Sequence, residues 1–289
     1  MGATTSEYAG SAAGRDGPAR RPLAASTARG PRGWLPVYEY RMRVYRRVWR
    51  GSLGSRILSP LLFLLAMGLG LGSLVDKGSG GIPHAGVVTP YLLFIVPAII
   101  ASQAMFTAMG ESTWPVLGAI RWSGVFYAML ASPLRVVDVV RGHFAFVATQ
   151  ITMATAIFMA VSAGFGGFRS WLALLCLPVS VLTGMAFTTL VTAFSGQQES
   201  DTGFNVLFRL VMTPLMLFSG TFFPIEALPV WLRPAAWLTP LWHGVEANRA
   251  LSLGQGSAVA VLGHVAVLVA FCAAGWWLAV RSFRRRLVM

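Results

Sequence analysis

Long apolar segments constrain the fold of this chain more than any other feature of its sequence. They follow one another at residues 57–75, 90–109, 142–163, 171–194, 205–220 and 257–280. A helix of about 20 residues spans the hydrocarbon core of a bilayer, which is about 30 Å thick. Inside that core the backbone must satisfy its own hydrogen bonds, which a helix does. The sequence therefore predicts an all-α integral membrane protein, with a six-helix transmembrane domain at residues 57–286.

The composition and the distribution of charge agree with a membrane protein. Hydrophobic residues make up 55% of the chain and charged residues 11%, whereas about a quarter of a soluble domain is charged. The net charge of +13 could suit a nucleic-acid partner, but residues 1–56 hold eleven arginines and the last nine residues hold four, beside apolar segments. Basic residues that flank spans favour the cytoplasm. We therefore expect a lipid membrane around the chain, cytoplasmic N- and C-termini and no nucleic-acid partner.

The region before the first apolar segment divides into two parts. Residues 1–33 are rich in Gly, Ala, Ser, Pro and Arg and lack the apolar core of a secretory signal, so we expect a disordered cytoplasmic tail. In residues 34–56, Val37, Tyr40 and Val44 recur at three- and four-residue spacing, and arginines cover much of the rest. This pattern predicts an N-terminal amphipathic helix on the inner membrane surface. A juxtamembrane anchor without a further role is the alternative.

Prolines interrupt the chain between the fifth and sixth apolar segments, and aromatic residues are interleaved with them. Proline removes a backbone donor and clashes with the preceding helical turn, so no straight helix crosses a bilayer here. Aromatic rings favour the headgroup level. Residues 222–250 are therefore predicted to form outer re-entrant helices that dip part-way into one membrane face and return. The candidate residues of this region are Phe222, Phe223, Pro224, Glu226, Trp237, His243 and Glu246.

The re-entrant region also contains ionisable residues, and burying them is costly unless they are paired or hydrated. We expect Glu226, His243, Glu246 and Arg249 to form an interfacial set of ion pairs. In the alternative interpretation, these side chains line an outer exit for an amphiphile.

Several motifs of catalytic and metal sites are missing from the sequence. There is no GxxxxGK[ST] phosphate loop, and the one lysine, Lys77, is followed by Gly-Ser in an expected outer loop. HExxH, CxxC and GxSxG are absent as well, and the four histidines are scattered. We therefore expect a protein that is not an enzyme and that holds no metal and no cofactor of its own.

Two pairs of motifs resemble a known family. The first pair is Ala-Ser-Pro-Leu at 131–134 with Val-Val-Asp-Val-Val-Arg-Gly at 136–142. The second is Leu-Phe-Ser-Gly-Thr-Phe-Phe-Pro at 217–224 with Leu-Pro at 228–229 and Pro-Leu-Trp-His at 240–243. At this separation they resemble the permease subunits of ABC-2 exporters, and among these the NodJ-like and daunorubicin-resistance-like permeases. The resemblance covers roughly residues 34–286.

This resemblance implies a half-transporter of the type V exporter kind in a bacterial inner (plasma) membrane. It would pair with a second permease, an identical copy or a relative, and with separate ABC ATPase subunits that hold ATP and Mg. The loop at residues 111–135 would include the coupling helix that contacts the ATPase. The candidate coupling residues are Glu111, Trp114, Arg121, Ser132 and Pro133, and those of a possible second ATPase contact are Glu199 and Asp201. Solvated loop charges are the alternative for Glu111 and Arg121.

Three functional hypotheses follow. The first is the membrane subunit of an ATP-driven exporter of a lipid-linked saccharide, a glycolipid or a hydrophobic drug. The second is a proton-driven secondary carrier, which usually needs a carboxylate in mid-membrane. Here Glu111 and Asp138 lie near the ends of the expected spans, which disfavours that hypothesis. The third is a membrane scaffold that transports nothing.

Overall fold

The computed structural model describes residues 32–84 and 86–288. The predicted tail at residues 1–33 lies outside these residues, except for Arg32 and Gly33. The longer helices are α1 (Leu35–Leu64), α3 (Tyr91–Ser112), α6 (Val136–Gly164), α7 (Cys176–Ser195), α11 (Pro240–Leu253) and α12 (Ala258–Leu287). The shorter elements are α2 (Gly72–Ser79), β1 (Ile82–His84), β2 (Val87–Thr89), α4 (Trp114–Arg121), α5 (Val125–Leu130), α8 (Thr202–Val206), α9 (Thr213–Phe218) and α10 (Arg233–Trp237).

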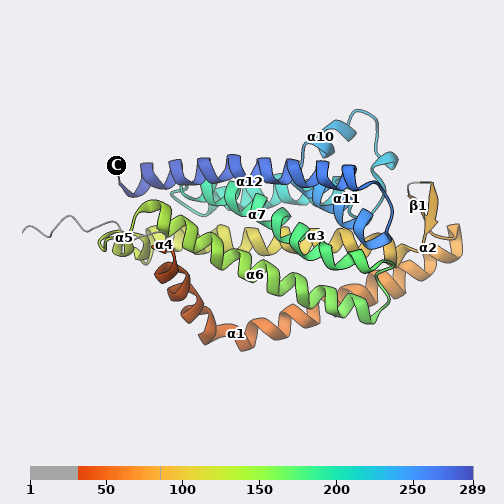
Figure 1. The fold of residues 1–289 in the computed structure, drawn as a ribbon, viewed down its shortest axis with the longest axis horizontal. Coiled ribbons are helices and arrows are strands. Elements are labelled where there is room, and N and C mark those ends of the chain that lie inside the picture. The colour runs from red at the N-terminus through yellow and green to blue at the C-terminus, as the bar shows by residue number, and fades with distance from the viewer. Residues whose placement is uncertain (1–31, 85, 289) are drawn as a thin grey trace, which may run out of the picture.

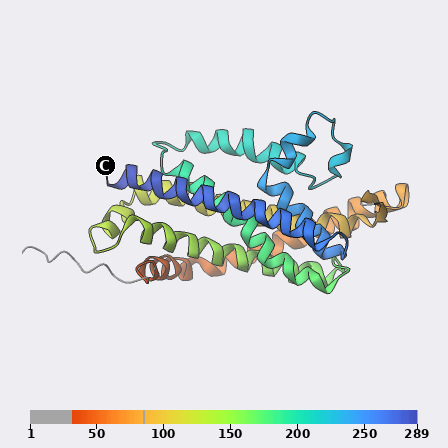
Figure 2. The same ribbon diagram turned by 45° about the horizontal axis from the view of Figure 1, so that its top comes forward.

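The long helices run side by side along the longest axis of the molecule (Figure 1). One end holds α4, α5, the start of α6 and the end of α12, and we call it the α4–α5 end. The opposite end holds α2 and the strands, and we call it the hairpin end. The same two ends are seen when the bundle is turned by 45° (Figure 2).

Within the described residues, five helices are long and apolar enough to cross a membrane: Leu61–Gly78, Tyr91–Arg121, Val136–Gly164, Trp171–Ser195 and Ala258–Leu287. The segment predicted as a fifth span, residues 205–220, forms a shorter apolar helix at Thr202–Phe218. Its middle part, Leu207–Met212, is wound as a π-helix. The predicted count of six spans is therefore not confirmed.

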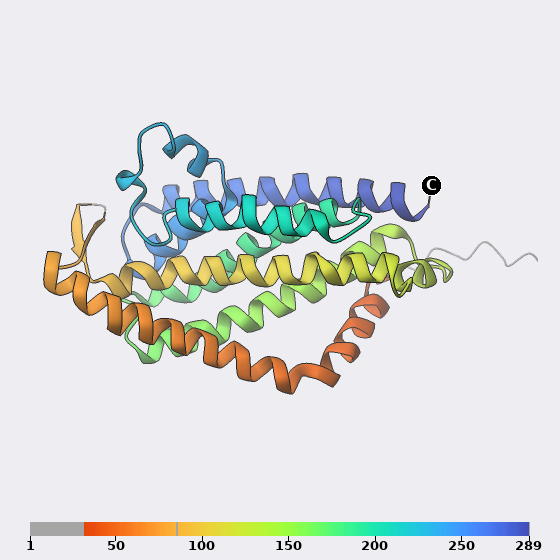
Figure 3. The same ribbon diagram turned by 180° about the vertical axis from the view of Figure 1, so that it is seen from behind.

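The predicted interfacial helix at residues 34–56 is the first part of the longer helix α1, which bends before it runs along the bundle (Figure 3). The expected apolar stripe is divided between two faces. Val37 is buried, but Tyr40, Val44 and Val48 are 43%, 50% and 59% exposed. The face that packs on the core is formed instead by Tyr38, Met42 and Tyr45. The helix therefore contacts the bundle on one side and has exposed apolar side chains on another.

The close approach of α1 to α6 depends on a glycine. A Cβ atom on Gly142 of α6 would lie 2.5 Å from Cβ of Val37 and 2.7 Å from the carbonyl oxygen of Trp34. Since real Cβ atoms do not come so close to other atoms, any side chain here would push α1 away. Gly142 thus fixes the start of α1 against the start of α6.

Several predicted element boundaries differ from the structure. The expected outer loop after the first span holds an antiparallel hairpin, in which Ile82 is paired with Thr89. The coupling loop predicted at residues 111–135 holds two helices, α4 and α5, because Gly124 between them has φ of 61°. Pro178 is tolerated in the fourth apolar segment, because it lies in the first turn of α7, where a proline needs no donor.

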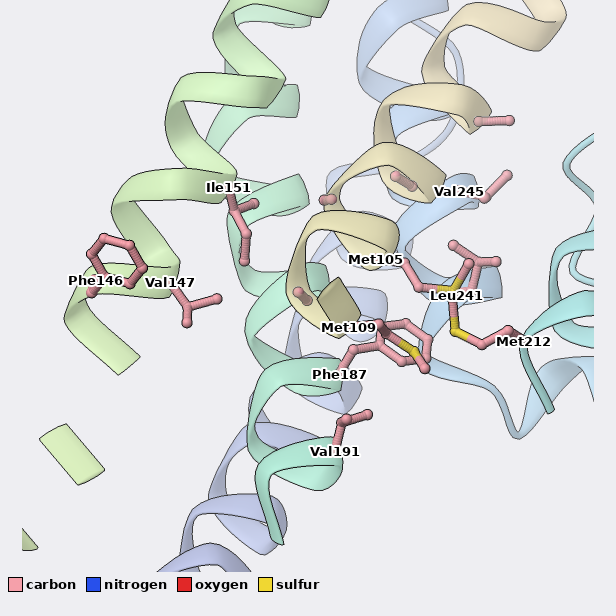
Figure 4. Close-up of a cluster of buried hydrophobic side chains, with 14 residues drawn as sticks. Met105, Met109, Phe146, Val147, Ile151, Phe187, Val191, Met212, Leu241 and Val245 are labelled. Atoms are coloured by element: carbon pink, nitrogen blue, oxygen red, sulfur yellow. The ribbon is translucent and has the colours of Figure 1, made fainter. Parts of the chain in front are cut away.

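The core of the bundle is a cluster of apolar side chains from several helices (Figure 4). Met105 and Met109 of α3 meet Phe187 of α7, Leu241 of α11 and Met212 of the π-helical stretch in this cluster. The unbranched methionine side chains can fill irregular gaps between helices that cross at different angles. The cluster joins the shorter helix at 202–218 to the long helices.

Candidate coupling site

The predicted coupling loop forms an exposed cap on the α4–α5 end (Figure 1). Arg121 ends α4 with its side chain exposed, and the neighbouring Trp122 is 70% exposed. Ser132 and Pro133 are exposed in the turn after α5, where the hydroxyl of Ser132 donates to the carbonyl of Met129 at 2.5 Å. Large exposed side chains at the tip of a loop leave surface for a partner.

Glu111 lies deeper, at the base of this cap, where it lines a groove between α1 and α4 with Arg41. Nη1 of Arg41 lies 2.7 Å from Nδ1 of His143, and its guanidinium lies 5.0 Å from the ring centre of Phe146. Because a guanidinium only donates, Nδ1 of His143 accepts. Burial lowers the pKa of Arg41, whereas the charge of Glu111 raises it. The predicted coupling residue Glu111 thus belongs to a network that joins α1, α3 and α6.

The groove between α1 and α4 has a volume of about 440 Å³. One wall is the exposed apolar face of α1, with Tyr40, Val44 and Val48. The other wall comes from α4, α5 and their connection: Pro115, Gly118, Ala119, Trp122, Ser123, Val125, Phe126 and Met129. The coupling loop and the amphipathic part of α1 therefore form one surface, although the sequence predicted them as separate elements.

Trp114 is 37% exposed, and its ring also packs against aromatic side chains of the protein itself. Its ring centre lies 5.3 Å from that of Phe204 in α8 and 5.4 Å from that of Phe208, against which it stacks. These contacts connect α4 to the start of the helix at 202–218.

The second predicted contact lies at the same end as the first. Glu199 and Asp201 are exposed in the connection between α7 and α8. Nη1 of Arg286 lies 3.4 Å from Oε1 of Glu199, and the hydroxyl of Tyr127 in α5 donates to the carbonyl of Arg286 at 3.4 Å. The end of α12 thus bridges the two predicted ATPase contacts, which the sequence did not reveal.

The predicted outer region lies at the hairpin end, where α10 and α11 pack on the bundle (Figure 1). Phe222, Phe223 and Pro224 are half-buried, and Glu226 and Trp237 are exposed. Nη2 of Arg233 donates to the carbonyl of Glu226 at 2.6 Å, and its Nε donates to the carbonyl of Leu228 at 3.1 Å. Short helices are present here as expected, and their entry into a membrane face stays a prediction.

Arg249 of α11 is the most buried charged group of this region, with 1% of its side chain exposed. It donates to Oε1 of Glu246 at 2.6 Å and to the carbonyl of Gly220 at 2.8 Å, and it lies 3.9 Å from the ring centre of Phe94. Burial lowers the pKa of Arg249, and Glu246 raises it. Of the four residues expected to form a set of ion pairs, Glu246 and Arg249 form a pair.

His243 forms a contact that the sequence did not indicate. Its Nδ1 lies 2.9 Å from Nδ1 of His264 in α12, and its Nε2 lies 2.9 Å from the carbonyl of Trp237. The description of the histidines as scattered is wrong for this pair, because α11 and α12 fold back on one another. The signal available in the sequence was His264 itself, an ionisable residue inside an apolar span.

Asn248, next to Arg249, was also missed. It is buried, and its side-chain amide donates to Oγ of Ser180 at 2.7 Å and to the carbonyl of Pro97 at 3.3 Å. Together Asn248 and Arg249 attach α11 to α3 and α7. Two consecutive polar residues within a buried helix were the signal in the sequence that could have indicated these contacts.

Comparisons with known proteins match most of the chain. The profile of the ABC-2 type transporter family matches residues 38–253. Nodulation protein J of Rhizobium leguminosarum bv. trifolii is 31% identical over 260 residues, which cover 90% of this chain and 95% of the relative. Nodulation protein J of Rhizobium meliloti (strain 1021) is 28% identical, with 88% and 94% covered. The probable multidrug ABC transporter permease YbhR of Escherichia coli (strain K12) is 27% identical, with 68% and 54% covered.

The family match includes both ends of the bundle, from the buried face of α1 to the end of α11. It also includes the predicted coupling loop and the residues around Arg249. With several helices of spanning length, the chain is a multi-pass membrane protein. It belongs to the ABC-2 type transporter family as a permease, a kind of protein that associates with an ABC ATPase subunit.

Proposed function

We propose that this permease is the membrane subunit of an ATP-driven exporter that moves a lipid-linked saccharide, a glycolipid or a hydrophobic drug out of the cytoplasm or the inner leaflet. The cap of α4 and α5 carries the proposal, since it presents Arg121 and Trp122 beside the groove on α1. The name of one relative, a probable multidrug ABC transporter permease, supports a drug among these substrates.

In this proposal the α4–α5 end faces the cytoplasm of a bacterial cell, and both termini lie on that side. The arginines at the end of α12 and at the start of α1 support this orientation. The helix at 202–218 then also crosses the membrane, which brings the number of spans to six. Residues 222–250 are re-entrant from the outer face. A second permease, identical or related, completes the transporter.

The ATPase partner supplies ATP and Mg, and this chain converts its movement into movement of the spans. A push on α4 reaches the helix at 202–218 through Trp114 and Phe204, whose ring centres lie 5.3 Å apart. It reaches α1 through Glu111 and Arg41, which line the groove between α1 and α4. Contiguous packing of this kind carries displacement between sites.

The test is purification of the chain with its cognate ATPase in mild detergent, followed by ATPase and transport assays. An Arg121→Glu variant is expected to lose co-purification by about tenfold, because it reverses an exposed charge at an interface. The matched control is Arg169→Glu, which reverses an exposed charge in the turn after α6, at the hairpin end. Equal loss in both variants would refute a coupling role for α4.

Transport without the ATPase would refute the proposal as a whole. If transport persisted without ATP and collapsed with an uncoupler, a proton-driven carrier would be indicated. If no ATPase and no transport were found, the scaffold hypothesis would be favoured.

A further inference from the structure

The ends of α6 and α12 carry a group of arginines that the proposed coupling does not use. Arg135 and Arg141 lie at the start of α6, and Arg281, Arg284 and Arg285 lie near the end of α12. These two helix ends are neighbours at the α4–α5 end (Figure 1). The arginines of α12 lie outside the residues that the family profile matches, 38–253.

Two cavities lie between these arginines. The first, about 620 Å³, is lined by Arg135, Arg141, Arg284, Val136, Val137 and Val288. The second, about 550 Å³, is lined by Arg281, Arg284, Arg285, Trp276, Trp277 and Val280. Arg284 belongs to both, and the guanidinium of Arg141 lies 5.7 Å from the ring centre of Trp276. We call this continuous surface the arginine pocket.

The positive charge of the arginine pocket is not balanced by nearby acids. Asp138 is buried and bonded to Arg135, whose Nε donates to Oδ2 at 3.2 Å. Glu199 is bonded to Arg286. Within residues 32–84 and 86–288, Arg141 and Arg284 form no salt bridge. An anionic group in the pocket would therefore find free guanidinium donors.

The apolar side of the pocket continues along α12. Trp277 is 59% exposed, and Leu278 and Val269 are 41% and 50% exposed. Tryptophan near the end of a span lies at the headgroup level of a membrane, where a basic pocket between helices suits an anionic headgroup. A ligand that fits both parts is anionic at one end and apolar at the other.

We propose that the arginine pocket binds the phosphate headgroup of an anionic phospholipid, whose acyl chains lie along the exposed face of α12. The headgroup bonds to Arg141 and Arg284, and the rings of Trp276 and Trp277 lie at the boundary between headgroup and chains. An acidic peptide would satisfy the arginines but would not need an apolar surface that runs along a membrane-spanning helix.

The experiment is native mass spectrometry of the full-length chain in mild detergent, titrated with dioleoyl-phosphatidylglycerol or dioleoyl-phosphatidylcholine. The wild type is expected to bind phosphatidylglycerol at least about tenfold more tightly than phosphatidylcholine. In an Arg141→Gln, Arg284→Gln variant, the affinity for phosphatidylglycerol is expected to fall by about 30-fold, with that for phosphatidylcholine unchanged. Both side chains are exposed, so circular dichroism is expected to show an unchanged fold.

Two further variants test the assignment. Lys77→Gln with Arg169→Gln removes two exposed charges near the hairpin end and is expected to bind both lipids as the wild type does. Arg141→Lys with Arg284→Lys keeps the charge and is expected to retain most of the affinity. Undiminished phosphatidylglycerol binding by the Gln variant would overturn the proposal. An equal loss of phosphatidylglycerol affinity in the Lys77, Arg169 control would also overturn it. So would a Gln variant that loses the ATPase partner but keeps phosphatidylglycerol binding.

Discussion

The two ends of the bundle are held together by different kinds of interaction. At the hairpin end, buried polar groups of α11 bond to the backbone of other segments: Arg249 bonds to the carbonyl of Gly220, and Asn248 bonds to that of Pro97. At the α4–α5 end, α4 is attached largely by apolar and aromatic contacts such as Trp114 against Phe208. Buried hydrogen bonds are directional, and their loss leaves an unsatisfied group, whereas apolar contacts tolerate sliding.

This difference suits two different roles for the two ends during transport. A segment that must move with an ATPase is better attached by contacts that can slide than by fixed bonds. A segment at the far end that must keep its position during that movement benefits from buried bonds.

Removing the buried arginine of α11 is expected to have the largest effect. Arg249→Met deletes the bonds to Glu246 and Gly220 and leaves buried acceptors without a donor. We expect a loss of about 3 kcal/mol of stability and a fall in the melting temperature of about 8 °C, measured by thermal unfolding in detergent. Arg121→Met at the α4–α5 end is the control, with an expected change below about 1 °C because the side chain is exposed.

Equal melting temperatures of these two variants would contradict the difference between the two ends. The buried charge of the hairpin end would then contribute no more to stability than the exposed charge of the α4–α5 end.

A methyl group at the contact between α1 and α6 is expected to have the next largest effect. Gly142→Ala places a Cβ against Val37 and Trp34, so we expect about 2 kcal/mol of destabilisation as α1 is displaced. Thermal unfolding and limited proteolysis at the start of α1 would measure it. Gly164→Ala at the other end of α6 is the control, since a Cβ there meets nothing within 4 Å.

If Gly142→Ala left both the melting temperature and the proteolysis of α1 unchanged, the close contact between α1 and α6 would not hold the α4–α5 end.

Truncating the aromatic link between α4 and the helix at 202–218 is expected to have a smaller effect on stability. Trp114→Ala removes the ring contacts with Phe204 and Phe208, so we expect a loss of about 1 kcal/mol. We also expect transport per ATP hydrolysed to fall by more than stability alone explains. Trp122→Ala is the matched control, because that ring is 70% exposed, and its melting temperature should stay near that of the wild type.

A variant Trp114→Ala with normal stability and normal transport per ATP would exclude this tryptophan as a mechanical link.

Acid is expected to weaken the hairpin end slightly through His243. Burial, and then the neighbouring His264, lower the pKa of His243. The unfolded chain therefore takes up a proton first as the pH falls below about 6.5. Stability from this pair is present above that pH and is lost on acidification. We expect the difference in melting temperature between pH 7.5 and pH 5.5 to shrink by about 2 °C in His243→Gln.

The same dependence on pH in the wild type and in His243→Gln would show that other groups set the acid sensitivity of this end.

The sequence predicted the helical membrane fold, the break in residues 222–250 and the family, because each depends on local composition or on short motifs. Its element boundaries were less accurate. The fifth segment was predicted as a span from its apolar residues, but the structure gives it a shorter helix with a π-helical middle. The outer loop after the first span was predicted without strands, although β-branched residues at Val87 and Val88 favour one.

The candidate site shows the same limit. Glu111 was predicted as a coupling residue from its place in the loop, but its neighbour Arg41 is 70 positions away in the sequence and was assigned to a membrane surface. Glu226, His243, Glu246 and Arg249 were predicted as one set of ion pairs, and Glu246 and Arg249, which lie one helical turn apart, form a pair. Pairs within a turn can be predicted from spacing, whereas pairs between helices cannot.

The sequence by itself thus determined that the chain is helical, membrane-embedded and a member of its family, since apolar length, charge placement and motifs are properties of consecutive residues. Only the tertiary structure decided which side chains meet. It placed Arg41 against His143, His243 against His264, and Arg141 over Trp276. Those contacts depend on how the helices bend and cross, which packing among many distant residues sets.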